Sequence, residues 1–133
     1  MLRLEVLRKG NGTIAPRGTT TVEYMFHGQL LVDYAAGRTV AFDSTYARSA
    51  PTAARPQDLR PGLAEALTRM VEGEKWRVWI PSELAYGARG GGKAIPPNQA
   101  LVYVIEVLHV RDAADITRGK MKHFATPVEY SEL

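Results

Sequence analysis

A nearly continuous run of β-forming residues constrains the fold more than any other feature of this chain. Residues 101–110 read LVYVIEVLHV, which places Leu101, Tyr103, Ile105 and Val107 on one face of an extended strand. A strand of this composition is expected inside a sheet, because an edge or half-exposed strand would leave apolar side chains in water. We therefore predict that residues 101–110 form a central antiparallel strand that is covered by a helix.

The covering helix is predicted just after a proline-punctuated segment. Pro61 suits a first helical position, where its missing N–H costs nothing. Apolar side chains then recur at the helical period on one face: Leu59, Leu63, Leu67 and Met70. We expect Gly73 to end the helix.

Shorter patterns supply the remaining elements. Strands are predicted at residues 2–7, 19–26, 39–43 and 75–80, because these stretches alternate or are rich in β-branched and aromatic residues. Turns are predicted at residues 10–12, near Gly28 and at residues 35–37, so that the second and third strands form a long hairpin. Residues 44–57 and 88–97 are expected to be irregular loops, the first with few buried anchors. The fold class predicted is α+β, an antiparallel sheet wrapped on one short helix.

Composition narrows the classes of function. A chain of 133 residues fits one domain, and it has no cysteine and three scattered histidines, so we expect neither a metal site nor a cofactor. The net charge of +3 comes from charges spread along the sequence, which does not favour nucleic-acid binding. No apolar run reaches the roughly 20 residues that span a bilayer, and the N-terminus lacks signal-peptide order. We therefore expect a soluble, cytoplasmic protein without membrane contact.

Six short fragments occur together in an order that resembles the FKBP family of peptidyl-prolyl cis–trans isomerases. They are Val22-x-Tyr24, Phe42-Asp43-Ser44, Pro61-Gly62, Ala85-Tyr86-Gly87, Ile95-Pro96-Pro97 and Leu101-Val102-Tyr103. The resemblance runs from about Leu4 to Val110, so we assign residues 1–110 to an FKBP-type domain and residues 111–133 to a C-terminal tail. It implies an antiparallel sheet curled round a short helix, with the active cleft between them.

The resemblance also implies a set of site residues. Tyr24, Phe42 and Tyr103 would form the aromatic walls of a proline pocket, and Leu63 would lie at its floor. Other members of the set would surround this pocket: Tyr86 and Ile95 on a closing loop, Asp43 at the rim, and a backbone N–H near Leu59 and Arg60 as an anchor for a substrate carbonyl. We further expect Arg48 to pair with Asp43 and the Tyr24 hydroxyl to donate to Asp43.

The activity implied is rotation about Xaa-Pro amide bonds in proline-containing peptides or proteins, which assists folding. Tyr24, Phe42, Asp43 and Tyr86 are the residues expected to act on the reacting amide. Such a pocket needs no nucleophile, because rotation breaks no bond and catalysis requires only tighter binding of the twisted amide. A macrolide is a further candidate ligand.

Two departures from the family keep a second function open. Leu63 stands where relatives commonly carry Trp, and residues 50–54, APTAA, are small where relatives place a bulky side chain. A non-catalytic FKBP-like domain that binds proline segments, or acts as a chaperone or adaptor, fits these losses. A third hypothesis, a small nucleic-acid binder, rests only on a sequence pI near 9.3.

Overall fold

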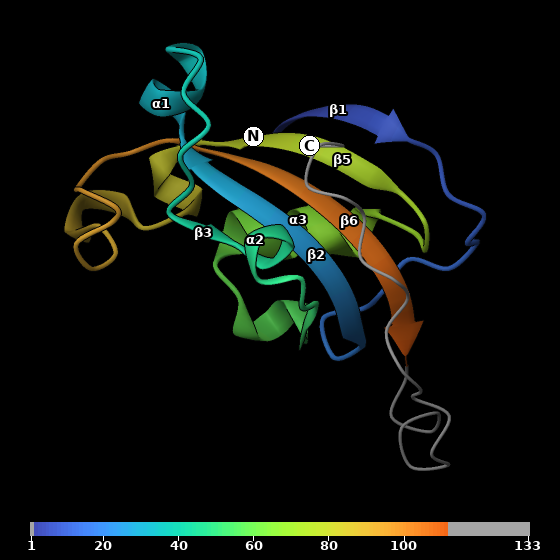
Figure 1. The fold of residues 1–133 in the computed structure, drawn as a ribbon. Helices are drawn as coiled ribbons and strands as arrows, with labels where there is room; N and C mark the ends of the chain where they lie inside the picture. Colours follow the sequence, from blue (N-terminus) through green and yellow to red (C-terminus); the bar gives the residue numbers. More distant parts are fainter. Residues whose placement is uncertain (1, 112–133) are drawn as a thin grey trace.

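The computed structural model describes residues 2–111. One antiparallel sheet of six strands runs in the order β1-β5-β6-β2-β3, with β4 pairing to β2 (Figure 1). Its strands are β1 (Arg3–Arg8), β2 (Thr21–Leu30), β3 (Asp43–Ser44), β4 (Thr52–Ala54), β5 (Lys75–Ile80) and β6 (Leu101–Arg111). The helices are α1 (Leu31–Ala35), α2 (Thr45–Arg48) and α3 (Pro61–Arg69), joined by the 3-10 turns η1 (Pro56–Asp58), η2 (Ser82–Leu84) and η3 (Gly87–Arg89). The predicted α+β class is confirmed.

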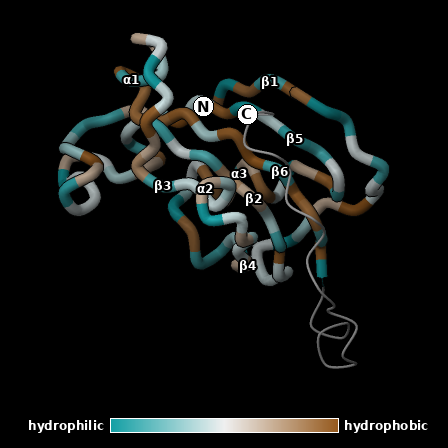
Figure 2. The backbone as a smooth tube through the Cα atoms, viewed as in Figure 1, coloured by the Kyte–Doolittle hydropathy of each residue, from teal (hydrophilic) through white to brown (hydrophobic). Residues whose placement is uncertain are grey.

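The strand predicted to be central is central. β6 pairs with β5 on one side and with β2 on the other, from Leu30↔Leu101 to Thr21↔Arg111. All its residues from Leu101 to Val107 are buried, as expected for a strand that is covered on both faces. Figure 2 shows the hydrophobic stretch of the chain along β6. The register with β2 shifts once, between Glu23 and Tyr24.

Helix α3 covers one face of the sheet, and the apolar side chains predicted to face the core do so, together with Ala66. Leu63, Leu67 and Met70 belong to the hydrophobic core, with Leu59 partly buried beside them. The predicted end at Gly73 is wrong, because α3 ends at Arg69 and Met70 turns into extended backbone with a fully buried side chain. Gly73 instead forms the following turn with a φ of 88°, a conformation that favours glycine. Among residues 2–111, no helix is long and apolar enough to cross a membrane.

The long hairpin is present in outline but differs from the prediction in detail. β2 does not turn at Gly28; it continues to Leu30, and Gly28 pairs with Tyr103 and Asp43. Helix α1 and a turn at Gly37 follow, and the returning strand is only β3, so residues 39–42 are not a strand. Gly28 therefore lies within the sheet and does not form a turn.

The segment 44–57 is more ordered than predicted. The Ser44 side chain accepts a hydrogen bond from the Ala47 N–H and so caps α2. Tyr46 is buried, and its hydroxyl donates to a carboxylate oxygen of Glu106 over 2.7 Å. The expectation of few buried anchors is wrong, because Ser44, Thr45, Tyr46 and Pro56 are all buried.

Candidate functional site

An aromatic cluster gathers on the helix-facing side of the sheet. Tyr24 comes from β2, Tyr103 from β6, and Phe42 from the segment just before β3. The Phe42 and Tyr103 ring centroids lie 5.7 Å apart at 89°, an edge-to-face contact. Tyr24 is 3% exposed and Tyr103 is 5% exposed, whereas Phe42 is only partly buried. The structure thus brings together the three residues predicted as aromatic walls.

A fourth ring, Phe26, joins this cluster and was missed as a site residue. Its centroid lies 5.9 Å from that of Tyr24 and 5.9 Å from that of Tyr103. The signal was available in the sequence, because side chains two residues apart on a strand point to the same face. Phe26 thus connects Tyr24 and Tyr103 through its ring.

Leu63, Ile95 and Tyr86 reach the same core from three different segments. Leu63 projects from α3, Ile95 is buried, and Tyr86 packs against the core from the segment between η2 and η3. The Tyr86 ring lies on Gly91, where a Cβ would come within 2.7 Å of its Cδ1. The Gly91 N–H donates to the Ile95 carbonyl over 2.8 Å, so the loop that carries both residues is closed on itself.

The tyrosine hydroxyls of the cluster influence one another and Asp43. Burial raises the pKa of Tyr24 to about 12, with smaller contributions from Asp43 and Tyr86. Burial also raises the pKa of Tyr103, with smaller contributions from Tyr86, Tyr24 and Asp43. Because ionisation of either hydroxyl is disfavoured, both remain protonated hydrogen-bond donors near neutral pH.

Asp43 lies at the exposed edge of the cluster and is held by its neighbours. Its carboxylate forms the predicted ion pair with Arg48 and accepts a hydrogen bond from the Ser44 N–H over 2.8 Å. The predicted donation from the Tyr24 hydroxyl is not among the hydrogen bonds of the described residues. The Asp43 charge acts on the Tyr24 hydroxyl through its field, as the second contribution after burial to the raised pKa of Tyr24.

Only one of the two backbone N–H groups predicted as anchors is available. The Leu59 N–H already donates to the Pro56 carbonyl over 3.0 Å, at the end of η1. The Arg60 N–H, at the N-cap of α3, has no hydrogen bond within residues 2–111. The Arg60 guanidinium carbon lies 4.7 Å from the centroid of the Tyr86 ring, which places Arg60 beside the aromatic cluster.

The small residues of segment 50–54 form part of the sheet rather than a wall of the cluster. Strand β4 pairs with β2, so that Thr52 lies opposite Tyr24 and Ala54 opposite Val22. Ala54 packs against the core without contributing a ring. The effect of small residues at this edge on the cluster stays a prediction.

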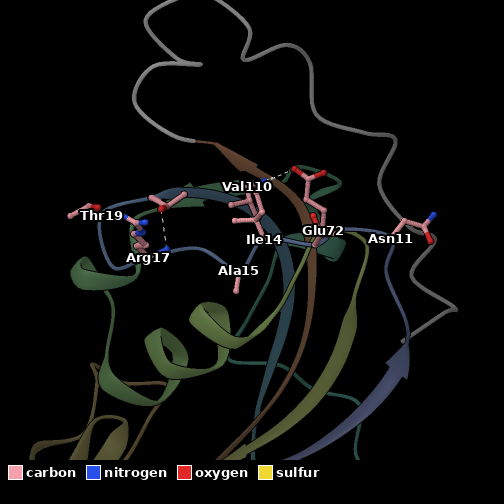
Figure 3. Close-up of a pocket in the computed structure, with 10 residues that line it drawn as sticks. Asn11, Ile14, Ala15, Arg17, Thr19, Glu72 and Val110 are labelled. Carbon is pink, nitrogen blue, oxygen red and sulfur yellow. Dashed lines mark hydrogen bonds between the residues drawn. The ribbon is translucent and has the colours of Figure 1, made fainter.

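A surface cavity of about 800 Å³ lies elsewhere, between the segment 11–20 and the end of β6 (Figure 3). Ile14, Glu72 and Val110 lie close together in it, and the Glu72 carboxylate accepts from the Val110 N–H over 2.7 Å. It shares no residue with the aromatic cluster. Within residues 2–111, no group of three or more His, Asp or Glu side chains is placed to bind a metal.

Comparison with known proteins identifies the fold that carries this cluster. The sequence model described as FKBP-type peptidyl-prolyl cis-trans isomerase matches residues 12–108. The chain belongs to this family. The FKBP-type 22 kDa peptidyl-prolyl cis-trans isomerase of Escherichia coli is 39% identical over 109 residues, which are 82% of this chain and 50% of that protein. The macrophage infectivity potentiator of Trypanosoma cruzi is 39% identical over 106 residues, which are 80% of this chain and 51% of that protein.

Solved structures share the FKBP fold. FkpA from Escherichia coli superposes with a TM-score of 0.73 at 37% identity, covering 84% of this chain and 49% of that one. A peptidyl-prolyl cis-trans isomerase from Pseudomonas syringae superposes with a TM-score of 0.72 at 32% identity, covering 84% and 76%. The chain spans about half the length of the curated FKBP relatives named above. The division at residue 110 stays a prediction, because residues 112–133 lie outside the described part.

Proposed function

We propose that this FKBP domain catalyses cis–trans isomerisation of Xaa-Pro bonds in peptides and proteins. The observation that carries the proposal is the convergence of Tyr24, Phe42, Tyr86 and Tyr103 on one cluster beside the Arg60 N–H, which has no hydrogen-bond partner within the described residues. The rings offer an apolar surface to a pyrrolidine ring. The polar groups at its edge offer donors to the carbonyls on either side.

Such a site breaks no bond, but it must lower a high barrier to rotation. An amide before proline isomerises over tens of seconds, because resonance sets a barrier of about 18–20 kcal/mol. Twisting the amide removes that resonance and reduces charge separation on its oxygen and nitrogen. An apolar environment therefore disfavours the planar isomers more than the twisted state, which lowers the barrier.

Each named side chain has a role in this proposal. Phe42, Tyr103 and Leu63 hold the proline ring, and Ile95 helps to exclude water. The Tyr86 hydroxyl donates to one substrate carbonyl and the Arg60 N–H donates to another, so that rotation occurs about a single bond of a held peptide. Asp43, fixed by Arg48, keeps a negative field beside the Tyr24 hydroxyl.

An isomerisation assay on short proline peptides tests the proposal directly. Magnetisation-exchange NMR measures the interconversion rate with and without the protein, and needs no coupling protease. We expect acceleration that Phe42→Ala abolishes and that Tyr86→Phe reduces about tenfold or more. Val32→Ala is the control, because Val32 is exposed on α1. If the wild-type protein leaves the interconversion rates unchanged, the proposal that it is an isomerase is rejected.

A non-catalytic proline-segment binder is the second candidate. Leu63 at the floor and the small residues of β4 favour it, because a less rigid wall holds the twisted amide less well. The same NMR samples separate the candidates: shifts of cluster resonances on adding peptide, without acceleration, identify a binder or adaptor. A macrolide is proposed as a competitor for the same surface in either case.

A further inference from the structure

Three cationic side chains lie at the start of α3 and on the loop between Tyr86 and Ile95. Arg60 is exposed and stacked on Tyr86, and Arg89 and Lys93 are exposed on the loop between Tyr86 and Ile95. None of these three forms an ion pair with any residue in 2–111. Among the carboxylates of the same segments, Asp43 pairs with Arg48 and Asp58 with Arg55, whereas Glu83 accepts a hydrogen bond from the neutral Ser82 hydroxyl and keeps its charge.

Arg60 is the cation whose position the structure defines best. Its guanidinium lies over the Tyr86 ring with the carbon 4.7 Å from the centroid, and Tyr86 is itself fixed on Gly91. A guanidinium that contacts a ring through its face keeps the N–H groups on its edge free, and these fit a carboxylate in a bidentate manner. The first turn of α3, which follows Arg60, contains no acidic residue that would compete for them.

The same residue also carries the backbone N–H for which the described part of the chain, residues 2–111, offers no acceptor. A peptide carbonyl bound there would bring the side chain of a neighbouring substrate residue close to the guanidinium. The Arg60 side chain can therefore bind the side chain of the residue next to proline, while the Arg60 backbone N–H binds a carbonyl of the same peptide. Both contacts come from one position at the start of α3.

We propose that Arg60 is a specificity-determining residue that favours substrates with a carboxylate side chain, Glu or Asp, adjacent to the proline. The inference rests on the proposed function, since it assigns a substrate class to the same site. It makes acidic proline segments better substrates than neutral ones and basic segments worse.

The size of the preference follows from the exposure of Arg60. An ion pair at a solvent-exposed site contributes modestly, so we expect kcat/KM for a Glu peptide to exceed that for the matched Gln peptide about two- to fivefold. The preference should shrink toward unity between about 0.01 M and about 1 M salt, because screening shortens the reach of charges. A purely steric preference would not depend on salt.

The experiment compares matched peptides that differ only in Glu, Gln or Lys, placed before the proline in one series and after it in another. The readout is the ratio of kcat/KM values within one protein sample, which cancels differences in folding or concentration. Arg60→Gln should bring the Glu/Gln ratio to about one, Arg60→Lys should retain much of it, and Arg60→Glu should favour the Lys peptide. Arg69→Gln is the matched control, since Arg69 lies at the other end of α3 and pairs with Glu65.

The outcomes separate this inference from the proposed function. Active protein with a Glu/Gln ratio of one in both series, or a ratio that Arg60→Gln leaves unchanged, would overturn the role of Arg60 alone. If the wild-type protein accelerates none of the peptides, the proposed function fails. In that case, dissociation constants for the same peptides, measured by NMR titration, still decide whether Arg60 selects acidic segments.

Discussion

The ring of Phe42 lies against the backbone of Gly28, the residue of β2 that pairs with Tyr103. A Cβ at Gly28 would come within 2.5 Å of the Phe42 Cζ, closer than real Cβ contacts. Phe42 also meets Tyr103 edge-to-face at 5.7 Å. The absence of a side chain at Gly28 therefore decides where an aromatic wall of the cluster stands.

Gly28→Ala should displace Phe42. We expect a loss of roughly 1–3 kcal/mol in the free energy of unfolding, from overpacking, together with a several-fold fall in isomerase activity. Chemical denaturation and the NMR exchange assay measure the two effects. Gly18→Ala is the matched control, because a Cβ there would meet only Gln57 Cβ at 3.8 Å. Equal effects of the two substitutions would argue against a special contact at Gly28.

Phe26→Leu should weaken the cluster from within. Phe26 links Tyr24 and Tyr103 through ring contacts, and Leu keeps the hydrophobic character while removing the ring. We expect reduced kcat/KM with a stability loss of about 1 kcal/mol. Tyr34→Leu removes a ring from the Tyr34–Trp79 pair, which contains none of the aromatic residues of the site, and should leave kcat/KM unchanged. An active site indifferent to Phe26→Leu would restrict the proline surface to the three rings first predicted.

Alkaline pH should destabilise the protein through Tyr24. Its pKa is raised to about 12 in the folded state, chiefly by burial, whereas an unfolded tyrosine ionises near 10. The protonated form is favoured by folding, so this stability is complete below pH 10 and is lost as pH rises toward 12. The unfolding free energy of the wild-type protein should fall between pH 10 and pH 12, and the unfolding free energy of Tyr24→Phe should fall less over the same window. Parallel profiles would show that Tyr24 does not titrate as described.

Asp43→Asn should separate function from stability. The Asp43–Arg48 pair is about half exposed on both sides, so its loss should change the unfolding free energy by less than about 1 kcal/mol. We expect kcat/KM to fall because the negative field beside Tyr24 disappears. Arg48→Gln keeps the carboxylate and its hydrogen bond from the Ser44 N–H, and should have a smaller effect on kcat/KM. Unchanged activity in Asp43→Asn would remove Asp43 from the catalytic set.

The sequence alone determined the parts of this protein that depend on local periodicity. The nearly continuous apolar run in 101–110 and the apolar spacing from Leu63 to Met70 predicted a buried strand and an amphipathic helix. Both are present, although the helix ends at Arg69 rather than at Gly73. The ordered fragments from Val22 to Tyr103 identified the family, and with it every ring of the cluster except Phe26. Burial of apolar side chains leaves such segments few alternatives.

Only the tertiary structure decided which groups come within contact distance across segments far apart in the chain. Local pattern suggested a turn at Gly28, but Gly28 lies inside β2, where the Phe42 ring packs against it and leaves no room for a side chain. It offered Leu59 and Arg60 equally as anchors, and the hydrogen bond from Leu59 to Pro56 leaves Arg60. The stack of Arg60 on Tyr86 joins two loops that no sequence spacing relates. These choices depend on packing between segments, which periodicity within a segment does not encode.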